Sequence, residues 1–253
     1  MRAAYDGIYF ELKRLIEDGT YAYGMLLPSE TILIKRFGCA HNTVRKALSI
    51  LASEGYVQPI HGKGVRIIYK RDFVPAAGQV YIDNSMGIES FAELAQRCGF
   101  TPSTTVIQME YVEVDDNMAQ VVPFEVGQRL LHMERVRYYD GKPLSWESNY
   151  FRDDIVAGIT KAAAKKSVYR FIESTNRGRI VTMRRKITVA PAIDKDYELI
   201  AMGDAGFVAV AHTITFDNYG ILCEFSEHRL HPSVFMVQQT AQKSRVNEPQ
   251  RND

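Results

Sequence analysis

The first 70 residues alternate between helical and strand-like patterns of apolar positions. Apolar side chains recur every three or four residues over 5–18, which predicts an amphipathic helix. Ser29 is a suitable N-cap for a second helix, and Gly38 is a suitable stop. The same helical spacing predicts a third helix over 42–54. Two of these helices therefore meet across a tight turn.

Two short strands are predicted after the third helix, over 56–60 and 65–69. Between them, His61, Gly62, Lys63 and Gly64 form the tip of a tight hairpin that carries a positive charge. Three helices followed by a hairpin are typical of a winged helix-turn-helix, in which the third helix enters the major groove of DNA. A plain surface hairpin is the simpler alternative for these four residues.

The polar face of the third helix can donate hydrogen bonds to phosphates or base edges. It carries Asn42, Thr43, Arg45, Lys46 and Ser49. On an isolated helix, such residues would more simply be a solvated face, and His41 could be an ordinary polar turn residue. The preceding turn and the following hairpin favour a DNA-contacting surface.

The second part of the chain is predicted to be mostly strands. A helix capped by Ser90 comes first and ends near Gly99. Strands are predicted at 104–114, 130–139, 144–150, 179–189, 208–216 and 221–228, with short helices at 115–121, 167–173 and 194–202. We therefore expect an α+β protein with a winged helix-turn-helix domain (1–69), a linker (70–85), a mostly antiparallel domain (86–238) and a disordered tail (239–253).

Two segments of the second part resemble each other. Residues 137–141 lead to Glu147, and residues 215–220 lead to Glu224, each through a glycine-containing turn between two predicted strands. This repetition predicts a pseudo-symmetric sheet.

One predicted strand places two arginines among apolar residues. With a period of two, Arg135 and Arg137 share a face with Leu131, Met133 and Tyr139. Unpaired buried charge is costly, so an anionic small molecule bound by the guanidinium groups would explain this pattern. An Arg/Glu lattice on an exposed sheet face is the alternative.

Composition narrows the class of protein. Hydrophobic residues make up 46% of the 253 residues and charged residues 24%, which excludes collagen-like and globally disordered chains. No apolar run approaches the roughly 20 residues of a membrane span, and the N-terminus lacks the features of a secretory signal, so we expect a cytoplasmic protein. The three cysteines are widely separated, which predicts neither a disulfide framework nor a zinc site.

The charge is divided unevenly along the chain. The net charge is +1, yet residues 1–71 contain 11 of the 31 basic residues and only 6 of the 30 acidic ones. A basic N-terminal part joined to a mildly acidic remainder indicates that the first part meets a polyanion.

Four motifs in residues 5–69 resemble the winged helix-turn-helix domain of GntR-type bacterial transcription regulators: LPSE at 27–30, NTVRKAL at 42–48, EGY at 54–56 and HGKG at 61–64. The resemblance implies DNA contacts from Thr43, Arg45, His61, Gly62 and Lys63. The polar helix face adds Asn42 and Lys46, and we also expect a contact from His41 in the turn before this helix. Ala40 and His41 stand where the family usually has Ser-Arg, so we expect a different operator or weaker binding.

The second part resembles the effector-binding UTRA domain of HutC-type GntR regulators, which is similar in fold to chorismate lyase. The resemblance rests on SFAE at 90–93, ERVR at 134–137 with DGKP at 140–143, and SVY at 167–169. In relatives that bind phosphorylated sugars, the pocket is lined by positions matching Ser90, Phe91, Arg135, Arg137, Glu147, Ser167, Tyr169 and Glu224. By resemblance, the two arginines and two serines hold the anionic group, and the glutamates bind hydroxyls or an amine.

We therefore expect a one-component repressor that binds a palindromic operator as a homodimer and responds to a small anionic effector, such as a sugar phosphate, phosphonate or carboxylate. No nucleophile elbow, phosphate-binding loop or HExxH motif indicates an enzyme, and we expect no cofactor or metal. Glu224, His228 and His231 are more simply structural residues than metal ligands. A ligand-binding or chorismate-lyase-like protein without operator binding is the alternative.

Overall fold

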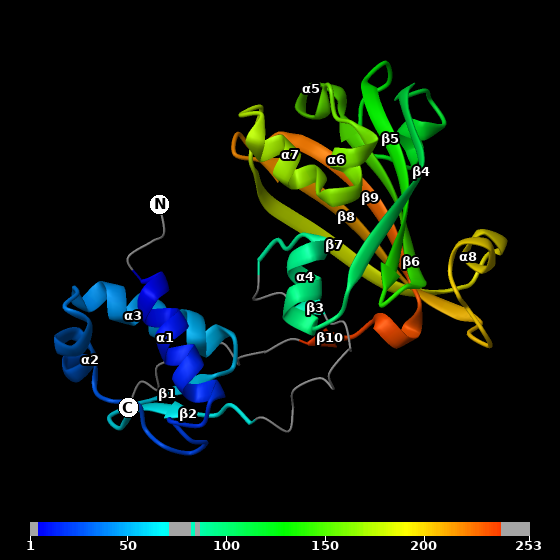
Figure 1. Ribbon diagram of the computed structural model, residues 1–253. Helices are drawn as coiled ribbons and strands as arrows, with labels where there is room; N and C mark the ends of the chain where they lie inside the picture. Colours follow the sequence, from blue (N-terminus) through cyan, green and yellow to red (C-terminus); the bar gives the residue numbers. More distant parts are fainter. Residues whose placement is uncertain (1–4, 71–81, 84–86, 239–253) are drawn as a thin grey trace, which may run out of the picture. The chain divides into compact units, whose positions relative to one another are not determined.

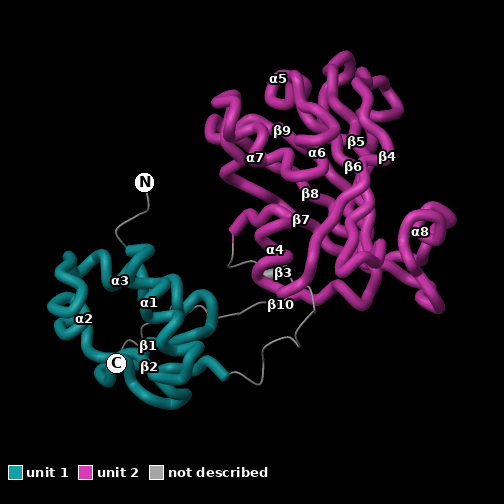
Figure 2. Tube along the Cα trace, in the orientation of Figure 1, with its two compact units in different colours: residues 1–75, 83–85, 238–253 teal, residues 76–82, 86–237 magenta. Residues whose placement is uncertain are grey.

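The computed structural model describes residues 5–70, 82–83 and 87–238 (Figure 1). Over this part, the chain divides into two compact units, one with the elements up to residue 70 and the other with those from residue 87 to 237 (Figure 2). The predicted linker falls mostly outside the described residues, and the predicted tail falls entirely outside them.

The first unit contains three helices and a hairpin. The helices are α1 (Asp6–Glu17), α2 (Glu30–Phe37) and α3 (His41–Ser53), and the strands are β1 (Val57–Ile60) and β2 (Gly64–Ile67). The two strands pair antiparallel, with Ile60 opposite Gly64 at the tip. All five elements predicted from the sequence are present, with ends shifted by at most two residues.

Local capping defines both ends of α2, and its second end begins the turn to α3. The Ser29 hydroxyl accepts a hydrogen bond from the Ile32 amide at the start of α2, and Gly38 ends the helix with a φ of 61°. This left-handed conformation suits glycine, since a side chain there would be strained. Leu12, Leu33 and Val44 are fully buried where the three helices meet.

The second unit is built on a six-stranded antiparallel sheet with the order β4-β5-β6-β9-β8-β7. The strands are β4 (Pro102–Glu113), β5 (Arg129–Tyr139), β6 (Lys142–Arg152), β7 (Ile180–Pro191), β8 (Phe207–Asp217) and β9 (Leu222–Leu230). Two three-stranded meanders, β4-β5-β6 and β7-β8-β9, thus meet where β6 pairs with β9, and Asn149 lies opposite Ser226 there. The predicted pseudo-symmetry and α+β class are confirmed.

Short elements make up the rest of the described structure. They are α4 (Phe91–Cys98), α5 (Asp153–Val156), α6 (Lys161–Lys166), α7 (Val168–Ser174), α8 (Asp194–Leu199), the 3-10 turns η2 (Met118–Gln120) and η3 (Pro232–Val234), and the strand pair β3 (Ile82–Asp83) and β10 (Val237–Gln238). The helix predicted over 115–121 is only the single turn η2, and the one predicted over 194–202 ends at Leu199. Helices α5 and α6 were not predicted, because four to six residues are too few for a clear helical period.

The two faces of the sheet have different coverings. On the face that we call the front face, Met133, Phe151 and Leu131 pack against the helical segment α5–α7, whose helices lie over the sheet in Figure 1. On the back face, Trp146 and Val136 pack against residues that follow α8. Each fully buried side chain of this kind contributes about 1.5–3 kcal/mol to folding.

Candidate functional site

Charged side chains gather in the middle of the front face because of the strand register. Glu147 on β6 lies opposite Arg135 on β5 and opposite His228 on β9. Residues paired across neighbouring strands point to the same face, so the three side chains form one row. Arg137 lies two residues along β5 from Arg135 and therefore on the same face.

Glu147 is shared by two buried arginines. Its Oε1 lies 2.6 Å from Nη2 of Arg135 and 2.5 Å from Nη2 of Arg137. Burial opposes the ionisation of Glu147, but the two guanidinium groups overcome it and lower the pKa of the carboxyl to about 2. Burial, and secondly Arg137, lower the pKa of Arg135 to about 10. This part of the site therefore carries two positive charges and one negative charge.

The remaining guanidinium donors are only partly satisfied. Arg135 donates to the Ala164 carbonyl at 3.0 Å and to Oδ1 of Asn149 at 3.2 Å, and Arg137 donates to Oγ1 of Thr104 at 2.8 Å. The Nε atoms of both arginines are buried and have no hydrogen-bond partner in the part of the chain that the structure describes. A buried donor without an acceptor costs about 1–3 kcal/mol, so an acceptor supplied by a bound molecule would stabilise each of these Nε atoms.

A second carboxylate, Glu224, is connected to this pair through Asn149. Its Oε1 accepts a hydrogen bond from Nδ2 of Asn149 at 3.0 Å, and its Oε2 accepts one from the Tyr169 hydroxyl at 2.5 Å and one from Thr215 at 3.3 Å. Burial raises the pKa of Glu224. Burial, and secondly Glu224, raise the pKa of Tyr169 far above its ordinary value, so the phenol remains a donor.

Six of the eight candidate effector residues thus belong to one contact network. Phe91 joins it through its ring, which lies 4.9 Å from the guanidinium carbon of Arg137. Ser90 and Ser167 have local partners: Ser90 caps α4 in a reciprocal bond with Glu93, and Ser167 accepts from the Arg170 amide at the start of α7. Among the described contacts, neither hydroxyl reaches Arg135 or Arg137.

Sequence reasoning missed several side chains of this network. Asn149 connects Arg135 to Glu224, and Thr215 donates a hydrogen bond to Glu224. The period of two on β6 and β8 was the signal that could have found them. His228 was considered only as a metal ligand, yet its Nε2 lies 3.1 Å from the Ser145 hydroxyl. Burial lowers its pKa to about 4, so it is neutral near pH 7. No cluster of three or more possible metal ligands occurs within the described ranges.

The candidate DNA-binding residues form the outer surface of the first unit. His41, Asn42, Arg45 and Lys46 are exposed on α3, and Thr43 is partly buried. The opposite face of α3, with Val44, Ala47, Leu48 and Leu51, belongs to the core. At the hairpin tip, His61, Gly62 and Lys63 are all exposed.

A carboxylate at the start of α2 contacts two of these side chains. Oε2 of Glu30 lies 2.7 Å from Nε2 of His41, and its Oε1 lies 4.0 Å from Nε of Arg45. Both contacts are largely exposed, so they contribute little to stability. Glu30 thus lies beside both side chains at the exposed start of α2.

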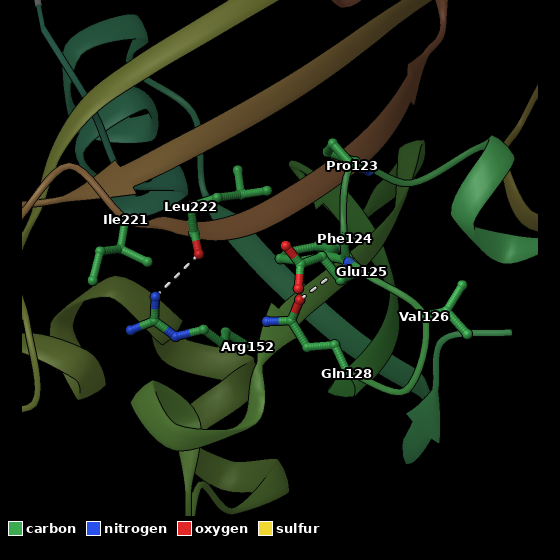
Figure 3. A pocket seen from close by; sticks show the side chains of 8 residues that line it. All are labelled: Pro123, Phe124, Glu125, Val126, Gln128, Arg152, Ile221 and Leu222. Atoms are coloured by element: carbon green, nitrogen blue, oxygen red, sulfur yellow. Dashed lines mark hydrogen bonds between the residues drawn. The ribbon is translucent and has the colours of Figure 1, made fainter.

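A separate open recess of about 440 Å³ lies near one end of the sheet (Figure 3). It is lined by the 123–128 loop, Arg152, Ile221 and Leu222 and includes none of the candidate effector residues. Arg152 donates to the Leu222 carbonyl at 3.2 Å, as Figure 3 shows, and also pairs with Asp154. Its guanidinium is therefore already engaged.

None of the helices in the described ranges combines the length and apolar character needed to cross a membrane.

Comparison with known proteins identifies both units. Residues 4–67 match the bacterial regulatory proteins of the gntR family, and residues 97–235 match the UTRA domain. The transcriptional regulator TreR of Bacillus subtilis (strain 168) is 29% identical over 223 residues, which cover 88% of this chain and 90% of TreR. The mannosyl-D-glycerate transport/metabolism system repressor MngR of Escherichia coli (strain K12) is 27% identical over 173 residues, which cover 68% of each chain.

The fold has solved counterparts. The crystal structure of the possible transcriptional regulator YydK from Bacillus subtilis superimposes with a TM-score of 0.73 at 19% identity, covering 95% of this chain and 100% of that one. These relatives and structural neighbours are transcriptional regulators, not enzymes. With a UTRA match over more than half of its length and a gntR match before it, the chain belongs to the GntR family of bacterial transcriptional regulators and carries a UTRA effector domain.

Proposed function

We propose that the protein is a repressor that binds a palindromic operator as a homodimer in the cytoplasm and responds to a small anionic effector. In this proposal, a DNA-binding domain at 1–69 is followed by a linker at 70–85 and by an effector and dimerisation domain at 86–238. Two copies of α3 would occupy successive major grooves, which requires half-sites about one helical turn apart.

The contacts to DNA are assigned to exposed side chains of the first unit: His41, Asn42, Thr43, Arg45, Lys46, His61, Gly62 and Lys63. Arg45 and Asn42 can read base edges through paired hydrogen bonds, whereas Lys46 and Lys63 suit phosphates. The exposure of the polar face of α3, opposite a buried apolar face, supports this assignment.

The shared carboxylate Glu147 is the observation that carries the effector proposal. Arg135 and Arg137 hold only one negative charge between them, and both keep a buried Nε without an acceptor. A phosphate, phosphonate or carboxylate supplies both the missing charge and the missing acceptors. The relative named for mannosyl-D-glycerate supports this class, because glycerate carries a carboxylate.

The rest of the site suits the uncharged part of such a molecule. Glu224 and Glu147 can accept hydrogen bonds from hydroxyls or an amine, Phe91 can pack against a sugar ring, and Ser90 and Ser167 can join the anion contacts when it is bound. A sugar phosphate meets all of these requirements.

A thermal-shift panel tests the effector proposal. Sugar phosphates, phosphonates, sugar acids and their neutral parent sugars are added to the full-length protein, and a ligand at about 100 times its Kd adds roughly 2.7 kcal/mol of stability. We expect acidic compounds to raise the Tm and neutral parents not to, with the gain lost in Arg137→Gln. Equal gains from neutral parents would contradict an anionic effector.

Fluorescence anisotropy with DNA from upstream of the protein's own gene tests the DNA proposal. We expect salt-dependent binding, two protomers per site and a change in affinity when the panel hit is added. Binding that fails at low salt would instead favour a ligand-binding protein without an operator.

A further inference from the structure

The front face carries a third arginine that the effector proposal does not use. Arg185 lies on β7, the edge strand of the sheet, and pairs with Thr213 on β8. Thr213 in turn pairs with Ser226, which pairs with Asn149. Because paired residues share a face, Arg185 stands in the same row as Asn149, the residue that connects Arg135 to Glu224.

Arg185 pairs with no carboxylate among the residues that the structure describes. Its Nε lies 3.5 Å from Oγ1 of Thr213 and its Nη2 lies 3.1 Å from Sδ of Met183, which are both weak acceptors at these distances. Within the described ranges, no carboxylate lies within ion-pairing distance of its guanidinium. Arg135 and Arg137, in contrast, are both held by Glu147.

The surroundings of Arg185 are those of the effector site. Its side chain is accessible to solvent, yet crowding by neighbouring atoms lowers the pKa of the guanidinium, while Tyr169 and Glu224 act to raise it. After burial and Glu147, the pKa of His228 responds to Arg137, Arg185 and Arg135 in that order. Arg185 therefore lies on the front face within electrostatic reach of Tyr169, Glu224 and His228.

We propose that Arg185 is a further effector-binding residue, which receives an acidic group of the effector from the β7 side of the site. The inference rests on the proposed function and extends it. Three arginines then face two carboxylates, Glu147 and Glu224, so the site has a net positive charge even when both are ionised. Because Arg185 is two strands beyond His228 while Arg135 is two strands before it, the effector presents acceptors toward both sides of the site.

The neighbouring Arg184 provides a matched control. It pairs with Ile214, so it lies on the opposite face of the same strand, and it is also exposed. Arg185→Gln and Arg184→Gln therefore remove the same charge from adjacent positions of the same edge strand. Arg185→Lys keeps the charge but loses the planar fork that binds an acidic group through two hydrogen bonds.

Isothermal titration of the full-length protein with glucose 6-phosphate, 6-phosphogluconate and inorganic phosphate tests the proposal. We expect Arg185→Gln to weaken binding of the acidic probes about 10- to 100-fold, as for a lost hydrogen bond to a charged group. Arg185→Lys should give an intermediate loss, and Arg184→Gln should leave the Kd within about twofold. Equal affinities for Arg185→Gln and Arg184→Gln would overturn the assignment.

A second measurement decides the case in which no sugar phosphate binds. Inorganic phosphate is titrated against the Tm in parallel with sodium chloride at equal ionic strength, and Arg184→Gln corrects for the general stabilising effect of phosphate. A phosphate-specific gain that is present in Arg184→Gln and lost in Arg185→Gln supports the proposal, and the same gain in both variants refutes it. If acidic probes bind but only Arg137→Gln weakens them, the proposed function survives and the role of Arg185 does not.

Discussion

Tyr169 donates its hydroxyl hydrogen to Glu224 across 2.5 Å and thereby ties helix α7 to strand β9. Glu224 is buried in the sheet, and Tyr169 is contributed by the helical segment that covers the front face. An effector that takes over a hydrogen bond of Glu224 would therefore also act on the position of α7. Under the proposed function, the pair would connect effector binding to the position of the helices on the front face.

Replacing Tyr169 by Phe removes this hydrogen bond and keeps the ring. Glu224 retains Asn149 and Thr215 as donors, so we expect a loss of about 1–2 kcal/mol in the free energy of unfolding. Urea denaturation followed by circular dichroism measures it. Tyr219→Phe is the control, since Tyr219 is 79% exposed. A loss of equal size in Tyr219→Phe would show that the hydrogen bond from Tyr169 to Glu224 does not stabilise the fold.

Replacing Glu147 by Gln leaves two buried guanidinium groups without their shared carboxylate. Removal of one partner from a buried ion pair typically costs about 3–5 kcal/mol, and we expect a loss in this range from urea denaturation. Glu134→Gln is the matched control, because Glu134 is also buried but pairs with the more exposed Lys195. We expect a clearly smaller loss there, and added phosphate should restore part of the stability only in Glu147→Gln.

Because His228 is buried as a neutral group, we expect the free energy of unfolding to decrease at mildly acidic pH. Burial lowers its pKa in the folded protein to about 4 from 6.5, so between these values the unfolded chain binds a proton that the folded chain does not. The stability contributed by neutral His228 is complete above pH 6.5 and is lost as the pH falls toward 4, by up to about 3 kcal/mol at roughly 1.4 kcal/mol per pKa unit. His228→Gln should flatten this part of the stability profile.

Other groups at the site change the pH profile in separate ways. Glu224, whose pKa is raised, contributes in the opposite direction, because the folded protein keeps its proton above the pH at which the unfolded chain loses it. The pKa of Glu147 is lowered to about 2, so its contribution is lost only below about pH 4.5. Comparison of His228→Gln with the unmodified protein between pH 4.5 and 6.5 isolates the histidine. Superimposable profiles would contradict its burial as a neutral group.

Substitutions of Arg45 and Glu30 are expected to change the affinity for DNA in opposite directions. Arg45→Ala should weaken operator binding by about 1–3 kcal/mol, whereas Glu30→Gln should strengthen binding at low salt, since it removes a carboxylate that competes with phosphate for His41 and Arg45. Anisotropy at several salt concentrations measures both. Arg14→Ala on α1 is the control for lost charge, and an equal effect of Arg14→Ala would argue against α3 as the recognition helix.

The local elements were predictable because they depend on short-range patterns. Ser29 and Ser90 cap helices as their positions before apolar periodic segments indicated, and Gly38 ends α2 in the left-handed conformation that its place in the sequence suggested. The strands were found by their period of two and their glycine turns. The helix predicted over 115–121 was too long. Asp115 does accept a hydrogen bond from the Met118 amide, as an N-cap residue does, but only the single turn η2 follows.

The sequence by itself determined most of the helices and the strands of the sheet, but not α5 or α6, since these elements follow from neighbours a few positions apart. It also placed Arg135 and Arg137 together on one face. Only the tertiary structure decided that both arginines share Glu147, that Asn149 links Arg135 to Glu224, and that Arg185 lies on the same face. The physical reason is strand register: Asn149 and Glu224 are 75 residues apart, and a shift of one residue in the β6–β9 pairing would send one of the two side chains to the other face.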